Sequence, residues 1–66
     1  MPSSDEFRQL DVLTERLSHR FPAIGTWTIA TIVSEIHRSF DDRPIRDFIP
    51  LLVERGAARR LTSAIR

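Results

Sequence analysis

The side chains that could take part in chemistry are few and do not form a recognised pattern. His19 and His37 fall on different helical segments, and neither belongs to a metal-binding motif such as H-E-x-x-H. We expect His19 to lie near a helix C-terminus as a cation and His37 to be a solvated or rim residue. The adjacent Asp41 and Asp42 precede an Arg-Pro pair, a position typical of turn and capping residues.

Other catalytic and cofactor-binding patterns are also missing from the sequence. The chain has no cysteine, which removes a Cys-based metal site and a disulfide framework, and its two glycines do not form a phosphate loop. Serine and threonine residues are scattered without a histidine base and an acid at suggestive positions. We therefore expect no enzyme activity, no cofactor and no metal site.

The length and charge of the chain restrict it further. Its 66 residues are predicted to form one domain over residues 1–66, near the lower size limit for a single core, where self-association is one remaining source of stability. Nine acidic residues nearly balance ten basic ones, all of which are arginine, so the formal net charge is +1. No signal-like or membrane-spanning stretch occurs, and we expect a cytoplasmic protein that does not enter a membrane.

Apolar periodicity predicts two helices in the first forty residues. Ser3 and Glu6 match a capping box, so a helix should begin at about Ser4 and end before Phe21-Pro22. The second helix should follow Gly25 or Thr26 and end at the polar residues after Phe40. The apolar positions that recur every three or four residues in these two segments are Phe7, Leu10, Leu13, Leu17, Ile29, Ile32, Val33, Ile36 and Phe40.

The third helical segment contains a proline, and its start has two possible positions. A continuous helix from about Pro44, bent at Pro50, would place Ile45, Phe48, Ile49, Leu52, Val53 and Gly56 on one stripe. Alternatively, Asp47 caps a helix that starts at Phe48, with Pro50 in its first turn. We prefer the bent helix because the apolar phase persists across the proline, and we expect the helix to continue past Gly56.

The third segment carries more apolar residues than one packed face requires. On a wheel of 100° per residue, a second stripe lies opposite the first and comprises Leu51, Ala58, Leu61 and Ile65. Either the helix bends and turns this stripe inward, or the stripe contacts another molecule. Trp27 also projects away from the apolar face of its helix, where it would either cover the preceding loop or contact a partner. The predicted interface is Trp27, Leu51, Ala58, Leu61 and Ile65.

These elements predict an all-α fold, an antiparallel three-helix bundle. Its expected core comprises Leu10, Leu13, Leu17, Ile29, Val33, Ile36, Phe40, Phe48 and Leu52. A small helix-turn-helix DNA-binding protein is the alternative. We expect nucleic-acid binding to be weak, because the start of the third helix is apolar and contains Pro50, and Asp47 would repel phosphate.

Three segments together resemble the small three-helix-bundle dimerisation domains of actinobacteria: "LTERLSHRFP", "TIVSEIHRSF" and "IRDFIPLLVERGAARRL". Such domains occur alone and are similar to the N-terminal extension of some arsenate reductases with a phosphatase-like domain. The resemblance implies pairing of two subunits and no chemistry. We therefore expect a non-catalytic interaction module, most simply a homodimer that uses its third helix. A related domain on another protein is a second expected partner.

Overall fold

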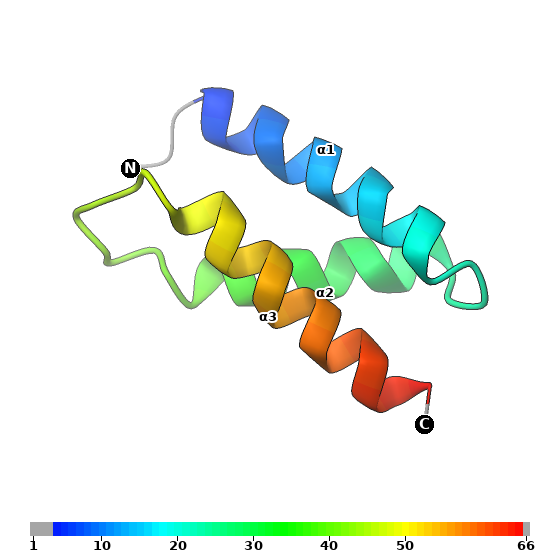
Figure 1. Cartoon of the computed structure of the whole chain (residues 1–66). Helices are drawn as coiled ribbons and strands as arrows, with labels where there is room; N and C mark the ends of the chain where they lie inside the picture. Colours follow the sequence, from blue (N-terminus) through cyan, green and yellow to red (C-terminus); the bar gives the residue numbers. More distant parts are fainter. Residues whose placement is uncertain (1–3, 66) are drawn as a thin grey trace.

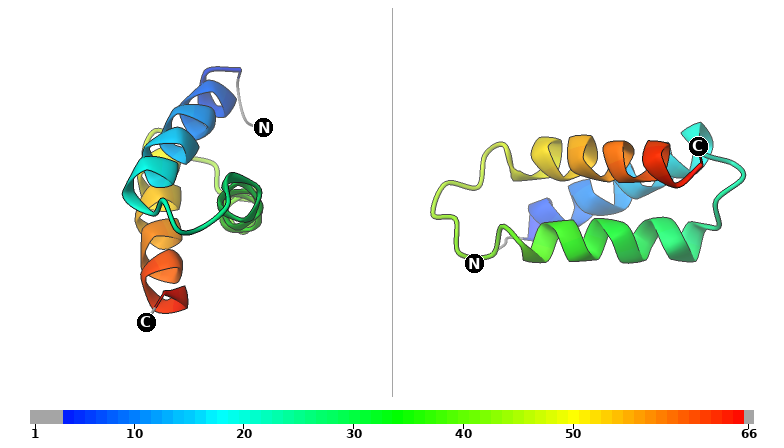
Figure 2. Two further views of the ribbon diagram at one scale, coloured as in Figure 1. Left: turned by 90° about the vertical axis from the view of Figure 1, so that its right-hand side faces the viewer. Right: turned by 90° about the horizontal axis from the view of Figure 1, so that it is seen from below.

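The computed structural model describes residues 4–65 and is all-α, which confirms the predicted fold class. The helices are α1 (Ser4–Arg20), α2 (Thr26–Arg38) and α3 (Ile49–Ala64). The chain runs in one direction along α1, returns along α2 and runs forward again along α3 (Figure 1). All three helices pack against one another. Seen along α2, helices α1 and α3 form one layer and α2 lies beside it (Figure 2).

The end of α1 and the start of α2 follow the sequence signals, whereas α2 ends earlier than predicted. Helix α1 ends at Arg20, before Phe21-Pro22, and Gly25 is the N-cap of α2, as predicted. Helix α2 ends at Arg38, so Phe40 belongs to the following turn but still packs against the core. Ser3 of the expected capping box lies outside the described residues.

The preferred course of the third helix is wrong. Helix α3 begins at Ile49 with Phe48 as N-cap, and Pro50 lies in its first turn, where its missing N–H leaves no intrahelical bond unmade. Residues 39–48 form a connecting loop. The alternative that placed Pro50 in the first turn was therefore closer, although the helix starts one residue later than it proposed.

The core face of α3 lies between the two stripes assigned from the sequence. The buried residues of this helix are spaced four apart: Ile49, Val53, Ala57 and Leu61. Phe48 and Leu52, both predicted to be core, are 66% and 39% exposed. Phe48 is misassigned because the helix begins only after it, so helical spacing does not determine where its side chain lies. Leu52 is misassigned because the small Ala57 was not weighed as a core residue.

The rest of the core agrees with the expected packing. Ile36 and Phe40 are partly buried against it, as are Ile24, Ile32 and Ala58. Gly56 of α3 lies next to Ile36 of α2, since a Cβ added at Gly56 would lie 3.4 Å from Cγ2 of Ile36. The buried residues of the hydrophobic core are Leu10, Leu13, Leu17, Phe21, Ile29, Val33, Ile49, Val53, Ala57 and Leu61.

Gly56→Ala is expected to stabilise the fold by up to about 1 kcal/mol, because glycine in a helix interior costs backbone entropy. Helix α3 continues through Gly56, and the added Cβ would make ordinary van der Waals contact with Ile36. Thermal unfolding measures the effect. Gly25→Ala is the matched control, since Gly25 is an N-cap residue where alanine is disfavoured. Destabilisation by Gly56→Ala would mean that the two helices cannot accept the extra methyl group.

Candidate interaction surface

The largest group of exposed apolar side chains lies at the start of α3. Ile45 and Phe48 precede the helix, and Leu51 and Leu52 occupy its first turn and a half; all four are exposed. Phe48 lines one groove together with Ile45 and Leu52, and Leu51 precedes Leu52 in the first turn of the helix. We call Ile45, Phe48, Leu51 and Leu52 the α3 outer patch. Large apolar patches are uncommon on the surface of monomeric proteins.

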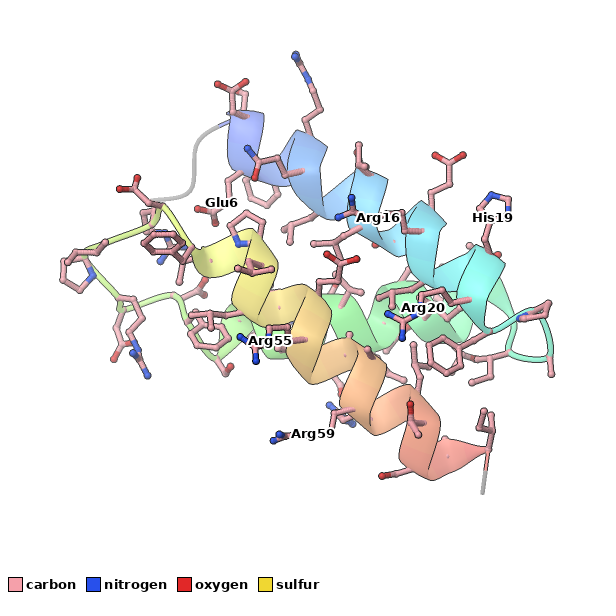
Figure 3. All side chains as sticks on the ribbon, viewed as in Figure 1. Glu6, Arg16, His19, Arg20, Arg55 and Arg59 are labelled. Atoms are coloured by element: carbon pink, nitrogen blue, oxygen red, sulfur yellow. The ribbon has the colours of Figure 1, made fainter. Side chains whose placement is uncertain are left out.

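Shallow grooves border the patch on both sides. One, of about 250 Å³, is lined by Ile45, Phe48 and Leu52 together with Arg43 and Pro44. The other, of about 330 Å³, lies between α1 and α3 and brings the exposed Val12 next to Leu51. An ion pair borders the second groove: Nη2 of Arg16 is 2.8 Å from Oε1 of Glu54. Figure 3 shows Arg16 on the side of α1 that faces α3.

A buried ionic cluster of Glu6, His37 and Arg46 holds the loop that leads into the patch. Glu6 of α1 is 4% exposed and His37 of α2 is 7% exposed. Arg46 donates from Nε to Oε1 of Glu6 at 3.1 Å and from Nη2 to Oε2 at 2.8 Å. Nε2 of His37 lies 2.6 Å from the same Oε2. The cluster therefore joins α1 and α2 to the loop between α2 and α3.

Arg46 also organises the loop itself. Its Nη1 donates to the carbonyl oxygens of Phe40, at 2.7 Å, and Arg43, at 3.1 Å. These carbonyl groups follow the end of α2, where backbone acceptors have no helical partner. Because Ile45 and Phe48 lie on either side of Arg46, the hydrogen bonds of this guanidinium group help to position the loop end of the α3 outer patch.

The electrostatics of the cluster favour a charged pair. The hydrogen bonds from Arg46 lower the pKa of the Glu6 carboxyl; burial opposes this, and the hydrogen bond with His37 adds to the lowering. The pKa of Arg46 is raised, chiefly by its hydrogen bonds to Glu6. A carboxylate whose two oxygens already accept these bonds is a weak base and a poor nucleophile. We therefore assign the cluster a structural role.

Sequence analysis missed this cluster, although a signal was present. Glu6 lies four residues before Leu10, so it continues the buried stripe of α1, and His37 lies four residues after the buried Val33. The expectation that His37 is a solvated or rim residue is wrong. A charged residue within an apolar stripe indicates a buried partner. The partner itself could not be identified, because Arg46 is on a loop whose course the periodicity does not predict.

The residues of the predicted interface do not lie together. Leu51 is half-exposed on the α3 outer patch, and Ala58 is partly buried against the core. The placement of Leu61 on a surface stripe is wrong: it is 0% exposed, because the core row of α3 has i+4 spacing and includes it. Trp27 and Ile65 are exposed, but Trp27 lies in the first turn of α2 and Ile65 follows the end of α3. Both of these helix ends are at the opposite end of the bundle from the start of α3 (Figure 1).

The remaining candidates for chemistry are also dispersed. His19 is exposed in the last turn of α1, as expected, and Asp41 and Asp42 lie in the turn after α2. Among residues 4–65, no group of three or more histidine, aspartate or glutamate side chains could hold a metal ion. An open groove of about 630 Å³ lies on the surface between α1 and α2. His37 lines this groove, but it is already hydrogen-bonded to Glu6.

Within the described part, no helix is long and apolar enough to span a membrane. Searches against protein-family models, curated proteins and solved structures found no match for this chain.

Proposed function

We propose that this chain is a non-catalytic protein-interaction module that pairs two copies of itself through the α3 outer patch. The observation that carries the proposal is the exposure of four large apolar side chains at the start of one helix, on a chain with a small core. In a two-fold dimer the same patch on both copies would cover itself. Because the net charge of each copy is only +1, overall charge repulsion between two copies is weak and does little to oppose such pairing.

The proposal differs from the interface expected from the sequence in its residues. It retains the third helix and Leu51, and it replaces the C-terminal stripe by residues that precede or begin α3. Leu61 is unavailable because it is buried, and Trp27 and Ile65 lie at the helix ends opposite to the start of α3. The DNA-binding alternative gains no support, because the first turns of α3, where a recognition helix would contact bases, present apolar side chains.

The test is a variant that removes the apolar patch without weakening the helix. Phe48 is the N-cap of α3 and Leu51 lies three residues later, so Phe48→Asp with Leu51→Glu converts this helix start into a capping box. The double variant should therefore keep its helical circular dichroism. We expect the wild type to sediment as a dimer whose dissociation depends on concentration, and the variant to sediment as a monomer.

Trp27→Ala is the matched control for this test, because Trp27 is the most exposed aromatic residue, at 85%, but lies away from the patch. It should leave the solution mass unchanged. A wild type that remains monomeric at every accessible concentration would refute the proposal. Loss of the dimer through Trp27→Ala but not through the double variant would place the contact at the other end of the bundle.

A further inference from the structure

We infer that the α3 outer patch also binds a segment of another protein, an apolar peptide with carboxylates at both ends, which competes with the second copy. The inference rests on the patch being an interaction surface, as in the proposed function, but it does not require the dimer to form. The patch is complementary to itself in apolar character, because each copy offers the same side chains. It is not complementary to itself in charge.

An arginine lies at the loop end of the patch. Of the described residues, Arg43 alone adds a charge to the groove of about 250 Å³ that Ile45, Phe48 and Leu52 line. Its guanidinium carbon lies 5.4 Å from the ring centroid of Phe40, a contact that holds the side chain in place. Arg43 is exposed and forms no ion pair within residues 4–65. Its charge is therefore open to a partner.

Two further arginines follow the patch along α3. Arg55 comes three residues after Leu52 and Arg59 comes seven residues after it, so the three side chains share one face of the helix. All three are exposed, and Figure 3 shows both arginines on the side of α3 that faces away from α1. Neither arginine forms an ion pair in the described part of the chain. Positive charge therefore borders the patch at both ends.

The carboxylates closest in sequence do not neutralise these arginines. Asp47 lines a separate groove, and Asp41 lines the groove between α1 and α2. Glu54 accepts the hydrogen bonds of Arg16, and the exposed Asp42 forms no ion pair with any described arginine. In a two-fold dimer, arginines of both copies would flank one apolar contact, and the patches themselves bring no carboxylate to it.

This distribution of charge indicates the chemistry of the competing partner. Opposite charges across an interface favour association, and like charges oppose it. An apolar segment with aspartate or glutamate at each end would cover the same side chains and also meet arginine at both ends. Arginine-based recognition of acidic motifs and the docking of apolar helix faces into grooves are both common modes of peptide binding. The groove can receive a side chain, which favours a peptide over a flat lipid surface of the same charge.

The length of this surface sets the length of the probe. From Phe48 to Arg59 the chain advances about 17 Å along the helix axis, at about 1.5 Å per residue. A helical peptide of about twelve residues has the same length. The probe is therefore a fluorescent peptide of this length with blocked termini, leucine and phenylalanine in its centre and glutamate at both ends. A matched peptide carries glutamine in place of each glutamate.

Fluorescence anisotropy at low ionic strength measures the binding of both peptides. We expect the glutamate peptide to bind the wild type at least about tenfold more tightly than the glutamine peptide. Arg43→Gln with Arg55→Gln should weaken binding of the glutamate peptide at least about tenfold. Arg20→Gln with Arg38→Gln is the matched control, because it removes the same charge from exposed sites on α1 and α2. It should change the affinity by less than about threefold.

Sedimentation tests the competition between the two occupants. Because they share the patch, the glutamate peptide should convert dimers into complexes of one chain with one peptide. Arg43→Gln with Arg55→Gln should leave dimerisation unchanged or strengthen it, since it removes like charges from the contact. Weaker dimerisation of this variant would mean that the arginines serve self-pairing, and it would overturn the inference.

The other outcomes separate this inference from the proposed dimer. Equal binding of the two peptides, or an equal loss in the control variant, would show that the arginines beside the patch are not recognised. Binding to phosphatidylglycerol vesicles without binding of either peptide would overturn the inference in favour of a lipid surface. A wild type that is monomeric but binds the glutamate peptide as expected would support the inference and refute the proposed dimer.

Discussion

Glu6→Gln is expected to lower the free energy of unfolding by about 1–3 kcal/mol, the range for leaving a buried hydrogen-bonding group without its partner. The amide cannot neutralise Arg46, and because the Arg46 side chain is 18% exposed, water replaces only part of the lost charge interaction. Urea unfolding followed by circular dichroism at neutral pH measures the difference. Glu15→Gln is the control, because Glu15 is exposed on the same helix and should change the stability by less than about 0.5 kcal/mol.

The pH dependence tests the charge of Glu6 separately from its packing. The pKa of Glu6 is lower in the folded chain than its ordinary value, so the unfolded state binds this proton more readily. The stabilising contribution is complete above the ordinary value of about 4.3 and is lost as the pH falls through the lower, folded value. The stability difference between the wild type and Glu6→Gln should therefore shrink in acid. A difference that stays constant down to about pH 3 would assign the effect to shape rather than charge.

Leu61→Ala is expected to cost roughly 2–5 kcal/mol, the range for truncating a large side chain in a core. Leu61 is completely buried in the last part of the core row of α3. Leu51→Ala is the matched control, since the same truncation at a half-exposed site should cost less than about 1 kcal/mol when the protein is dilute enough to be monomeric.

The measurement for this pair is chemical unfolding at several protein concentrations. Leu61→Ala should lower the midpoint equally at all of them, because it acts within one copy. Leu51→Ala should mainly reduce the dependence of the midpoint on concentration, because it acts on association. Equal, small effects of the two substitutions would contradict the burial of Leu61.

The sequence was sufficient to predict the fold class and the first two helices. Periodic leucines in α1, the Phe21-Pro22 break and the glycine before α2 are local signals, and each depends on only a few neighbouring residues. The start of α3 was harder to predict, because a proline such as Pro50 occurs both at a bend within a helix and in the first turn of a helix. That choice depends on where residues 39–48 travel, which is decided by contacts of Arg46 with residues distant in sequence.

The candidate surface could be predicted only in part. An excess of apolar residues in the third segment was visible, but dividing it into core and surface needs the rotation of α3 about its own axis. In the structure the small Ala57 is completely buried on the core face, and Gly56 lies next to Ile36 of α2. The periodicity instead gave weight to the larger Phe48 and Leu52, which the structure exposes.

The shared hydrogen bonds of Glu6, His37 and Arg46 have a consequence for how the chain loses its structure. The three side chains come from α1, α2 and the loop before α3, so undocking any one of these segments leaves a polar or charged group without its partner in apolar surroundings. Partly folded states are penalised more heavily than apolar contacts alone would require. The three helices should therefore melt as one cooperative unit, without a populated two-helix intermediate.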